Sequence, residues 1–152
     1  MKAGFLKATL LAAMMAVTGV AQAADFTIRA TANSNENDED YDGLVVFKNY
    51  VESASNGAIA VELFIGTQLC SKGAECLQGV ADGSIDVYIS TSGGAAGIFP
   101  YVQVLDLPYL MADDRVAEHV LSGDFTRTMR EMALEDSGGK IRLMTILSLI
   151  HI

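Results

Sequence analysis

The chain has 152 residues, with 19 acidic and 10 basic side chains, and its formal net charge at pH 7 is −9. This acidic balance gives no general attraction for nucleic acid or for anionic lipid, so an anionic ligand would need a local cationic contact. A chain of this length builds one modest hydrophobic core, and we expect one domain.

The N-terminus has the three parts of a secretory signal peptide. Lys2 and Lys7 form a short basic region, residues 10–20 are mostly apolar, and Ala21–Ala23 supplies small residues for an A-x-A cleavage site. The apolar run is too short for a membrane span, and no cysteine stands at the cleavage point to carry a lipid anchor. We expect residues 1–23 to be removed on export to the periplasm, which takes two lysines away and changes the formal charge from −9 to −11.

The first part of the mature chain predicts a strand, a helix and a second strand. Apolar and polar residues alternate with a period of two over Phe26–Thr31 and again over Ile59–Ile65, as they do in half-buried strands. Between them, apolar residues recur at helical spacing from Asp42 to Ala54, and Asn56-Gly57 is typical of a helix end. Residues 33–42 are polar and acidic but lack the spacing and the glycine of an EF-hand, so we expect a solvated loop and no metal.

The second part continues the alternation of helices and strands. A short helix at Glu75–Ala81 and a turn at Asp82-Gly83 precede a third strand, Ile85–Ser90. After Pro100 comes an apolar segment with an internal proline, Val104–Met111. We then expect two amphipathic helices and a fourth strand, at Asp113–Leu121, Asp124–Glu135 and Lys140–Ile146.

This order of elements predicts an α/β fold with a parallel sheet (βαβαβ) and right-handed crossovers. We expect the strand order 2-1-3, in which the topological switch lies between the first and third strands. Ligands of such sheets bind outside the carboxyl ends of the strands at the switch. The residues expected there are Asn33, after the first strand, and Thr91, Ser92, Gly93 and Gly94, after the third.

The glycine-rich stretch after the third strand does not indicate a cofactor or an enzyme. Ser92–Gly97 loosely resembles a dinucleotide-binding loop, but such a loop follows the first strand of the fold and opens a helix. Ser92 also lacks the G-x-S-x-G pattern of a nucleophile elbow. His119 lies in a helical pattern and His151 near the end of the chain, so no set of residues argues for catalysis.

The two cysteines, Cys70 and Cys76, have five residues between them. Zinc sites usually have closer pairs and two further ligands, which the sequence does not supply. Export to an oxidising compartment favours a disulfide, with two unpaired thiols as the alternative.

The chain resembles the solute-binding proteins of tripartite ATP-independent periplasmic (TRAP) transporters from about Phe26 to Ile146. The segments that carry the resemblance are, in chain order, Phe47–Glu52, Ser55–Gly57, Val61–Phe64, Gln68-Leu69, Gly83–Asp86, Phe99-Pro100 and Val104–Tyr109. Each segment is weakly specific, whereas their order and spacing together are fairly specific. One departure is Cys70, which stands where the family usually has glycine and supports a local disulfide variant.

The resemblance implies a two-lobed α/β fold that closes over a small organic anion, with a carboxylate expected, and delivers it to the permease subunits of the transporter. By the resemblance, Asn33 and Thr91 match family positions that line the cleft. Residues Ser92–Gly94 and 68–75 are their neighbours and are weaker candidates for lining it. Alternatively, Asn33 only caps a turn and Thr91 only ends its strand. The arginine that clamps the substrate carboxylate in this family has no match among Arg29, Arg115, Arg127, Arg130 and Arg142.

The last six residues, Leu-Ser-Leu-Ile-His-Ile (147–152), match one translated frame of a transposon end used to build sequencing libraries. We therefore expect residues 24–146 to be the first lobe and the start of the crossover of a longer protein, followed by an adapter-derived tail. A genuine strand continuing from residues 143–146 is the alternative. Two other functions remain open, the binding component of an ATP-driven importer and a secreted α/β hydrolase with its catalytic residues in the missing part.

Overall fold

The computed structural model describes residues 24–146, so the expected signal peptide and the expected adapter-derived tail lie outside the described residues. Within this range the chain forms a three-stranded sheet in the order β2-β1-β3. The strands are β1 (Phe26–Ala32), β2 (Ile59–Ile65) and β3 (Val87–Ile89), and β1 pairs in parallel with both neighbours. The α/β fold and the predicted strand order are confirmed.

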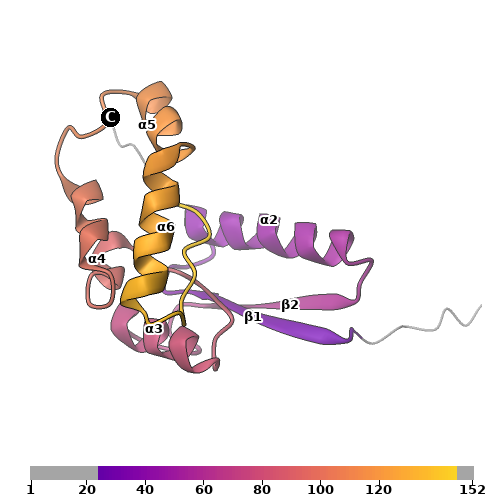
Figure 1. The fold of residues 1–152 in the computed structure, drawn as a ribbon. Helices are drawn as coiled ribbons and strands as arrows, with labels where there is room; N and C mark the ends of the chain where they lie inside the picture. The colour runs from indigo at the N-terminus through magenta and orange to yellow at the C-terminus, as the bar shows by residue number, and fades with distance from the viewer. Residues whose placement is uncertain (1–23, 147–152) are drawn as a thin grey trace, which may run out of the picture.

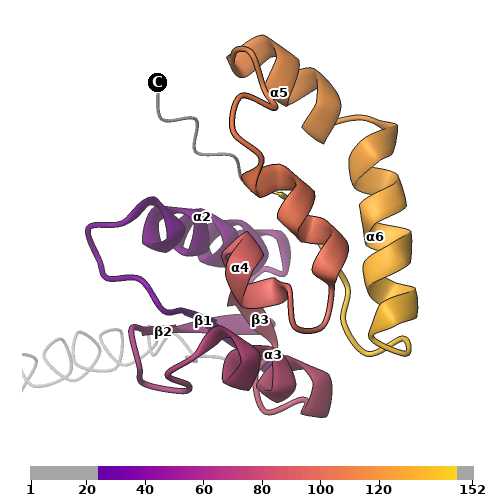
Figure 2. The same ribbon diagram turned by 90° about the vertical axis from the view of Figure 1, so that its left-hand side faces the viewer.

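The two crossover helices are α2 (Glu39–Ala54) and α3 (Gly73–Asp82). They lie on opposite sides of the strands, as Figure 2 shows. The remaining helices follow β3 in chain order and are α4 (Ser92–Ala95), the 3-10 helix η1 (Pro100–Asp106), α5 (Asp114–Leu121) and α6 (Asp124–Asp136). None of the helices in residues 24–146 is long and apolar enough to cross a membrane.

The main core lies between the sheet and α2. Ala30 and Ala32 of the central strand are fully buried and form one cluster with Leu44 of α2 and Val61 of β2. Alternate residues of a strand point to the same face, which explains why positions 30 and 32 act together. Their small side chains let α2 pack closely over the centre of the sheet.

Helix α2 begins at Glu39, three residues before the predicted start at Asp42. Its first turn contains Glu39, Asp40 and Asp42, and carboxylates near a helix N-terminus are stabilised by the helix dipole. The acidic stretch that we expected to be entirely a loop therefore supplies the first turn of a helix.

The third strand is shorter than expected, because residues 85 and 86 precede it and Ser90 follows it. Ile85 is buried beside Cys70 and Cys76 instead. The backbone N–H of Asp86 donates to the Arg29 carbonyl oxygen at 3.0 Å, so this residue still joins the edge of β1.

The predicted fourth strand, Lys140–Ile146, is wrong for the described structure, in which residues 141–146 form no strand. Leu143 and Ile146 pack instead against a second core, which contains Met129 and Ala133 of α6. A side chain of the same helix, Arg130, donates a hydrogen bond to the Met144 carbonyl oxygen. An apolar alternating segment needs a partner strand to become part of a sheet, and here it lies along a helix (Figure 1).

Substitution of Leu44 tests the main core, because Leu44 is 1% exposed. Val46 on the same helix is 69% exposed and serves as a control. We expect Leu44→Ala to lower the free energy of unfolding by about 2–5 kcal/mol, from lost burial and the cavity left behind. The matched control Val46→Ala should change it by less than about 0.5 kcal/mol. Urea unfolding followed by circular dichroism measures both, and equal losses in the two variants would contradict this core.

Candidate functional site

Asn33 follows the central strand directly and connects three segments of the chain. Its side-chain amide nitrogen, Nδ2, donates to the carbonyl oxygens of Cys70 at 3.0 Å and Gly66 at 3.4 Å. Its amide oxygen, Oδ1, accepts a hydrogen bond from the Tyr88 hydroxyl at 2.5 Å. Asn33 is exposed at the carboxyl edge of the sheet, where the topology predicted it.

The orientation of the Asn33 amide follows from its partners. Backbone carbonyl oxygens only accept hydrogen bonds, so the nitrogen must face Cys70 and Gly66 and the oxygen must face Tyr88. Burial raises the pKa of the Tyr88 phenol above its ordinary value, the nearby Ser90 hydroxyl opposes this shift, and the negative charge of Asp40 adds to it. Tyr88 therefore keeps its proton at neutral pH and is the donor to Asn33.

Thr91 to Gly94, the second candidate segment, folds into a helical turn rather than the open glycine loop that the sequence suggested. Thr91 is the N-cap of α4, and its side-chain oxygen accepts a hydrogen bond from the Gly94 backbone N–H at 3.1 Å. The Ser92 hydroxyl donates to the carboxylate of Asp106 in η1. Thr91 and Gly93 are exposed, and Ser92 and Gly94 are half-buried.

The glycines of α4 allow a close approach to another part of the backbone. A Cβ atom added to Gly73, the first residue of α3, would lie 2.8 Å from the Gly94 Cα atom. A Cβ atom added to Gly94 would lie 2.8 Å from the Ser90 hydroxyl oxygen. The close neighbour of Gly73 is backbone, so a side chain there would force α3 and α4 apart, whereas the close neighbour of Gly94 is the Ser90 side chain.

The predicted disulfide between Cys70 and Cys76 is present in the structure, with a Cα–Cα distance of 5.2 Å. Cys70 is 4% exposed and Cys76 is fully buried. Ser71 donates hydrogen bonds to Glu75 through its backbone N–H at 2.9 Å and its hydroxyl at 2.8 Å, and both lower the pKa of that carboxyl. We refer to residues Cys70–Cys76 as the disulfide loop.

Three arginines already have partners inside the described structure. Arg29 pairs with Asp86 at 3.1 Å and also donates to the Gly83 carbonyl oxygen at 2.7 Å. Arg127 pairs with Asp124 at 2.9 Å, and Arg130 donates to Met144. None of these bonds involves Asn33 or the α4 turn.

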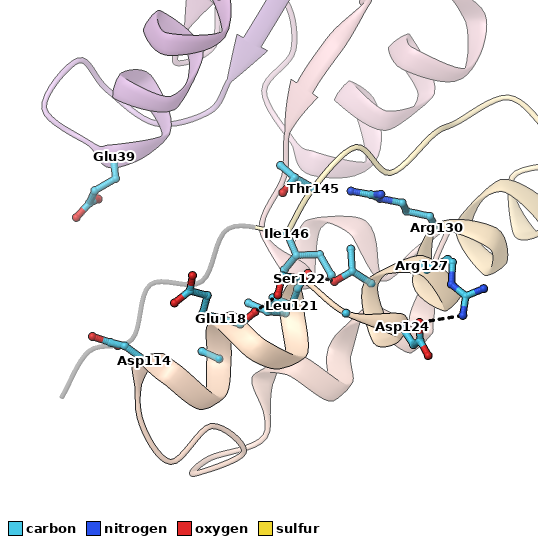
Figure 3. A pocket seen from close by; sticks show the side chains of 13 residues that line it. Glu39, Asp114, Glu118, Leu121, Ser122, Asp124, Arg127, Arg130, Thr145 and Ile146 are labelled. Atoms are coloured by element: carbon cyan, nitrogen blue, oxygen red, sulfur yellow. Dashed lines mark hydrogen bonds and ion pairs between the residues drawn. The ribbon is translucent and has the colours of Figure 1, made fainter.

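An open crevice among the described residues, with a volume of about 1090 Å³, lies elsewhere (Figure 3). It is lined mainly by α5 and α6, with Glu39 at the start of α2 and Thr145 and Ile146 completing its wall. Asn33 and the residues of the α4 turn do not line it. The crevice and the candidate site are thus different features of the molecule.

Sequence reasoning predicted the places of Asn33 and Thr91 in the fold and the disulfide, but it did not single out Tyr88. Tyr88 lies in β3, which pairs with β1, and Asn33 directly follows β1. That register was available only once the strands were paired. In the same way, the meeting of Gly73, at the start of α3, with Gly94 of α4 has no local sequence signal.

Residues 30–142 match the model of the bacterial extracellular solute-binding protein, family 7, and the chain belongs to this family. It is 26% identical over 132 residues to the 2,3-diketo-L-gulonate-binding periplasmic protein YiaO of Escherichia coli (strain K12). That alignment covers 87% of this chain and 40% of YiaO.

Solved structures of TRAP periplasmic solute-binding proteins share the fold. The protein from Ochrobactrum anthropi is 26% identical, with a TM-score of 0.68 over 76% of this chain and 35% of that chain. The protein from Roseobacter denitrificans OCh 114, solved with bound L-galactonate, is 22% identical, with a TM-score of 0.69 over 76% of this chain and 38% of that chain. The chain thus spans well under half the length of these relatives. The TRAP resemblance is confirmed, and the findings support neither the ATP-driven importer nor the hydrolase.

The disulfide gives a direct chemical prediction. Thiol titration of the unfolded, unreduced mature chain should find no free thiol at Cys70 or Cys76, because both sulfurs are bonded to each other. Closing so short a loop adds at most about 2 kcal/mol through chain entropy, so the bridge acts mainly on local geometry. Reduced protein is the control and should release two thiols per chain. Two free thiols before reduction would show that the bridge does not form.

Proposed function

We propose that the chain is the first lobe of a periplasmic solute-binding protein that captures a small organic anion for a TRAP transporter. The observation that carries this proposal is the convergence of Asn33 and the Thr91–Gly94 turn at the carboxyl edge of a parallel sheet with the order β2-β1-β3. The edge of such a sheet at its topological switch is where small ligands bind. Family membership and the shared fold support the same conclusion.

We further propose a carboxylate as the solute. The name of YiaO gives 2,3-diketo-L-gulonate as its ligand, and related structures contain L-galactonate, or succinate in the protein from Sulfurospirillum deleyianum DSM 6946. All three compounds are organic acids with a carboxylate group.

The proposed contacts, Asn33, Thr91, Ser92 and the backbone amides of Gly93 and Gly94, include no cationic group. In this structure the Asn33 amide, the Ser92 hydroxyl and the Gly94 N–H already have partners within the lobe, and the partner of Ser92 is the carboxylate of Asp106. A neutral hydrogen bond contributes about 0.5–1.5 kcal/mol net, whereas micromolar affinity needs about 8 kcal/mol. We infer that the complete protein has a second lobe, corresponding to the part of its relatives that this chain does not span. A cationic group in that lobe would supply charge-assisted hydrogen bonds, and closure of the lobe would exclude water.

This function also gives roles to the N-terminal segment and to the loaded protein. Residues 1–23 direct export to the periplasm, and the loaded protein delivers its solute to the membrane permease subunits. The protein performs no catalysis of its own and uses no cofactor. Capture without a chemical step agrees with membership of a family of solute-binding proteins.

Titration calorimetry tests the proposal with succinate, L-galactonate and 2,3-diketo-L-gulonate as ligands. We expect the complete two-lobed protein to bind at least one organic acid of this class with micromolar affinity or better. Residues 24–146 alone should give no saturable heat, because neutral bonds on one open wall fall short of the required free energy.

Two outcomes would contradict this account in different ways. Micromolar binding by residues 24–146 alone would mean that the anion site lies wholly in this half of the protein. Failure of the complete protein to bind any organic acid, together with hydrolysis of a simple ester, would favour the secreted hydrolase instead.

A further inference from the structure

The disulfide loop touches both segments of the candidate site. On one side, the Cys70 carbonyl oxygen accepts the 3.0 Å hydrogen bond from the Asn33 amide. On the other side, Gly73 in the same loop meets the Cα atom of Gly94 in α4. The two candidate segments are far apart in the sequence, and this one loop lies against both.

The contact with Asn33 occupies the hydrogen-bonding groups of that side chain. Both hydrogens of Nδ2 point to carbonyl oxygens, those of Cys70 and Gly66, and Oδ1 accepts from Tyr88. The Cys76 sulfur also lies 3.4 Å from Oδ1, and since a disulfide sulfur carries no proton this is a packing contact. In this arrangement Asn33 holds the surrounding segments in place and has no free N–H to offer a carboxylate.

The contact with α4 is a close approach of two backbone segments, at Gly73 and Gly94. A Cβ atom on Gly73 would lie 2.8 Å from the Gly94 Cα atom, and a Cβ atom on Gly94 would lie 2.8 Å from the Ser90 hydroxyl oxygen and 3.2 Å from that of Thr91. A shift of Gly73 therefore moves the backbone that carries Thr91, Ser92 and Gly93. The buried disulfide and the Ser71–Glu75 hydrogen bonds restrict such a shift, because they close the loop at both ends.

We propose that the Cys70–Cys76 disulfide is a positioning element of the solute site, which fixes the relative places of Asn33 and the α4 turn, and that Asn33 is a positioning residue. This inference rests on the proposed function. It predicts that the bridge changes solute affinity through geometry, although it contributes little to the stability of the whole chain.

Two variants perturb the loop in independent ways in the complete protein. Cys70→Ala with Cys76→Ala removes the bridge, and Gly73→Ala keeps the bridge but adds a methyl group 2.8 Å from Gly94. Gly97→Ala is the matched control, because a Cβ atom at Gly97 meets nothing within 4 Å. Circular dichroism first establishes that each variant is folded.

Hydrogen exchange measured by nuclear magnetic resonance reports on the contacts of the disulfide loop with Asn33 and with α4, and it needs no ligand. The side-chain NH2 signal of Asn33, assigned by its loss in Asn33→Asp, should exchange with water at least about tenfold faster in the cysteine variant, because one of its acceptors is released. The Ala95 backbone amide, which donates to the Thr91 carbonyl oxygen at 3.0 Å, should exchange faster by a similar factor in Gly73→Ala. Gly97→Ala should match the parent protein at both positions.

Calorimetry with the organic acid that the parent protein binds measures the effect of each variant on solute affinity. We expect both loop variants to bind about five- to tenfold more weakly, the equivalent of one hydrogen bond, and Gly97→Ala to bind as the parent does. Parent-like exchange rates in both loop variants would overturn the inference, and so would altered exchange with unchanged affinity. If the parent binds no organic acid, the proposed function fails, and the exchange rates alone still decide whether the loop fixes the two segments.

Discussion

The parallel pairing of β1 with both of its neighbours is the constraint on which the rest of the structure depends. Ala32, the last residue of β1, is opposite Ile65 of β2 and Ile89 of β3, so all three strands end at one edge. The segments that follow them therefore converge: Asn33, the loop from Gly66, and the α4 turn. Helices α2 and α3 make this pairing possible because each crossover returns the chain to the same end of the sheet.

The sequence was a good guide where local pattern determines structure. Period-two alternation located the strands, helical spacing located α2, and the order of elements was enough to expect the central position of β1. The fourth strand failed because a strand exists only with a partner, and residues 141–146 lie along α6 instead. The α4 turn was also missed, since Gly93 and Gly94 disfavour a helix locally, and the contact of Gly94 with Gly73 depends on the tertiary fold.

For the candidate site, topology predicted the location of Asn33 but could not predict its hydrogen bonds. Its partners, Tyr88 and the carbonyl groups of Gly66 and Cys70, come from distant parts of the chain. Their identity depends on strand register and on the path of the disulfide loop, which no local pattern encodes. The candidate residues carry no positive charge in an acidic protein, so an anion there would need a cationic partner from elsewhere.

The central claim is that a small organic acid meets this lobe at the carboxyl edge of the sheet. Backbone amide spectra of the complete, 15N-labelled protein, recorded during titration with an organic acid that it binds, test this claim most directly. The account predicts that, within residues 24–146, the largest shifts cluster at Asn33 and at Thr91–Gly94. Shifts concentrated instead along α5 and α6, around Arg127 and Arg130 in the open crevice, would contradict it.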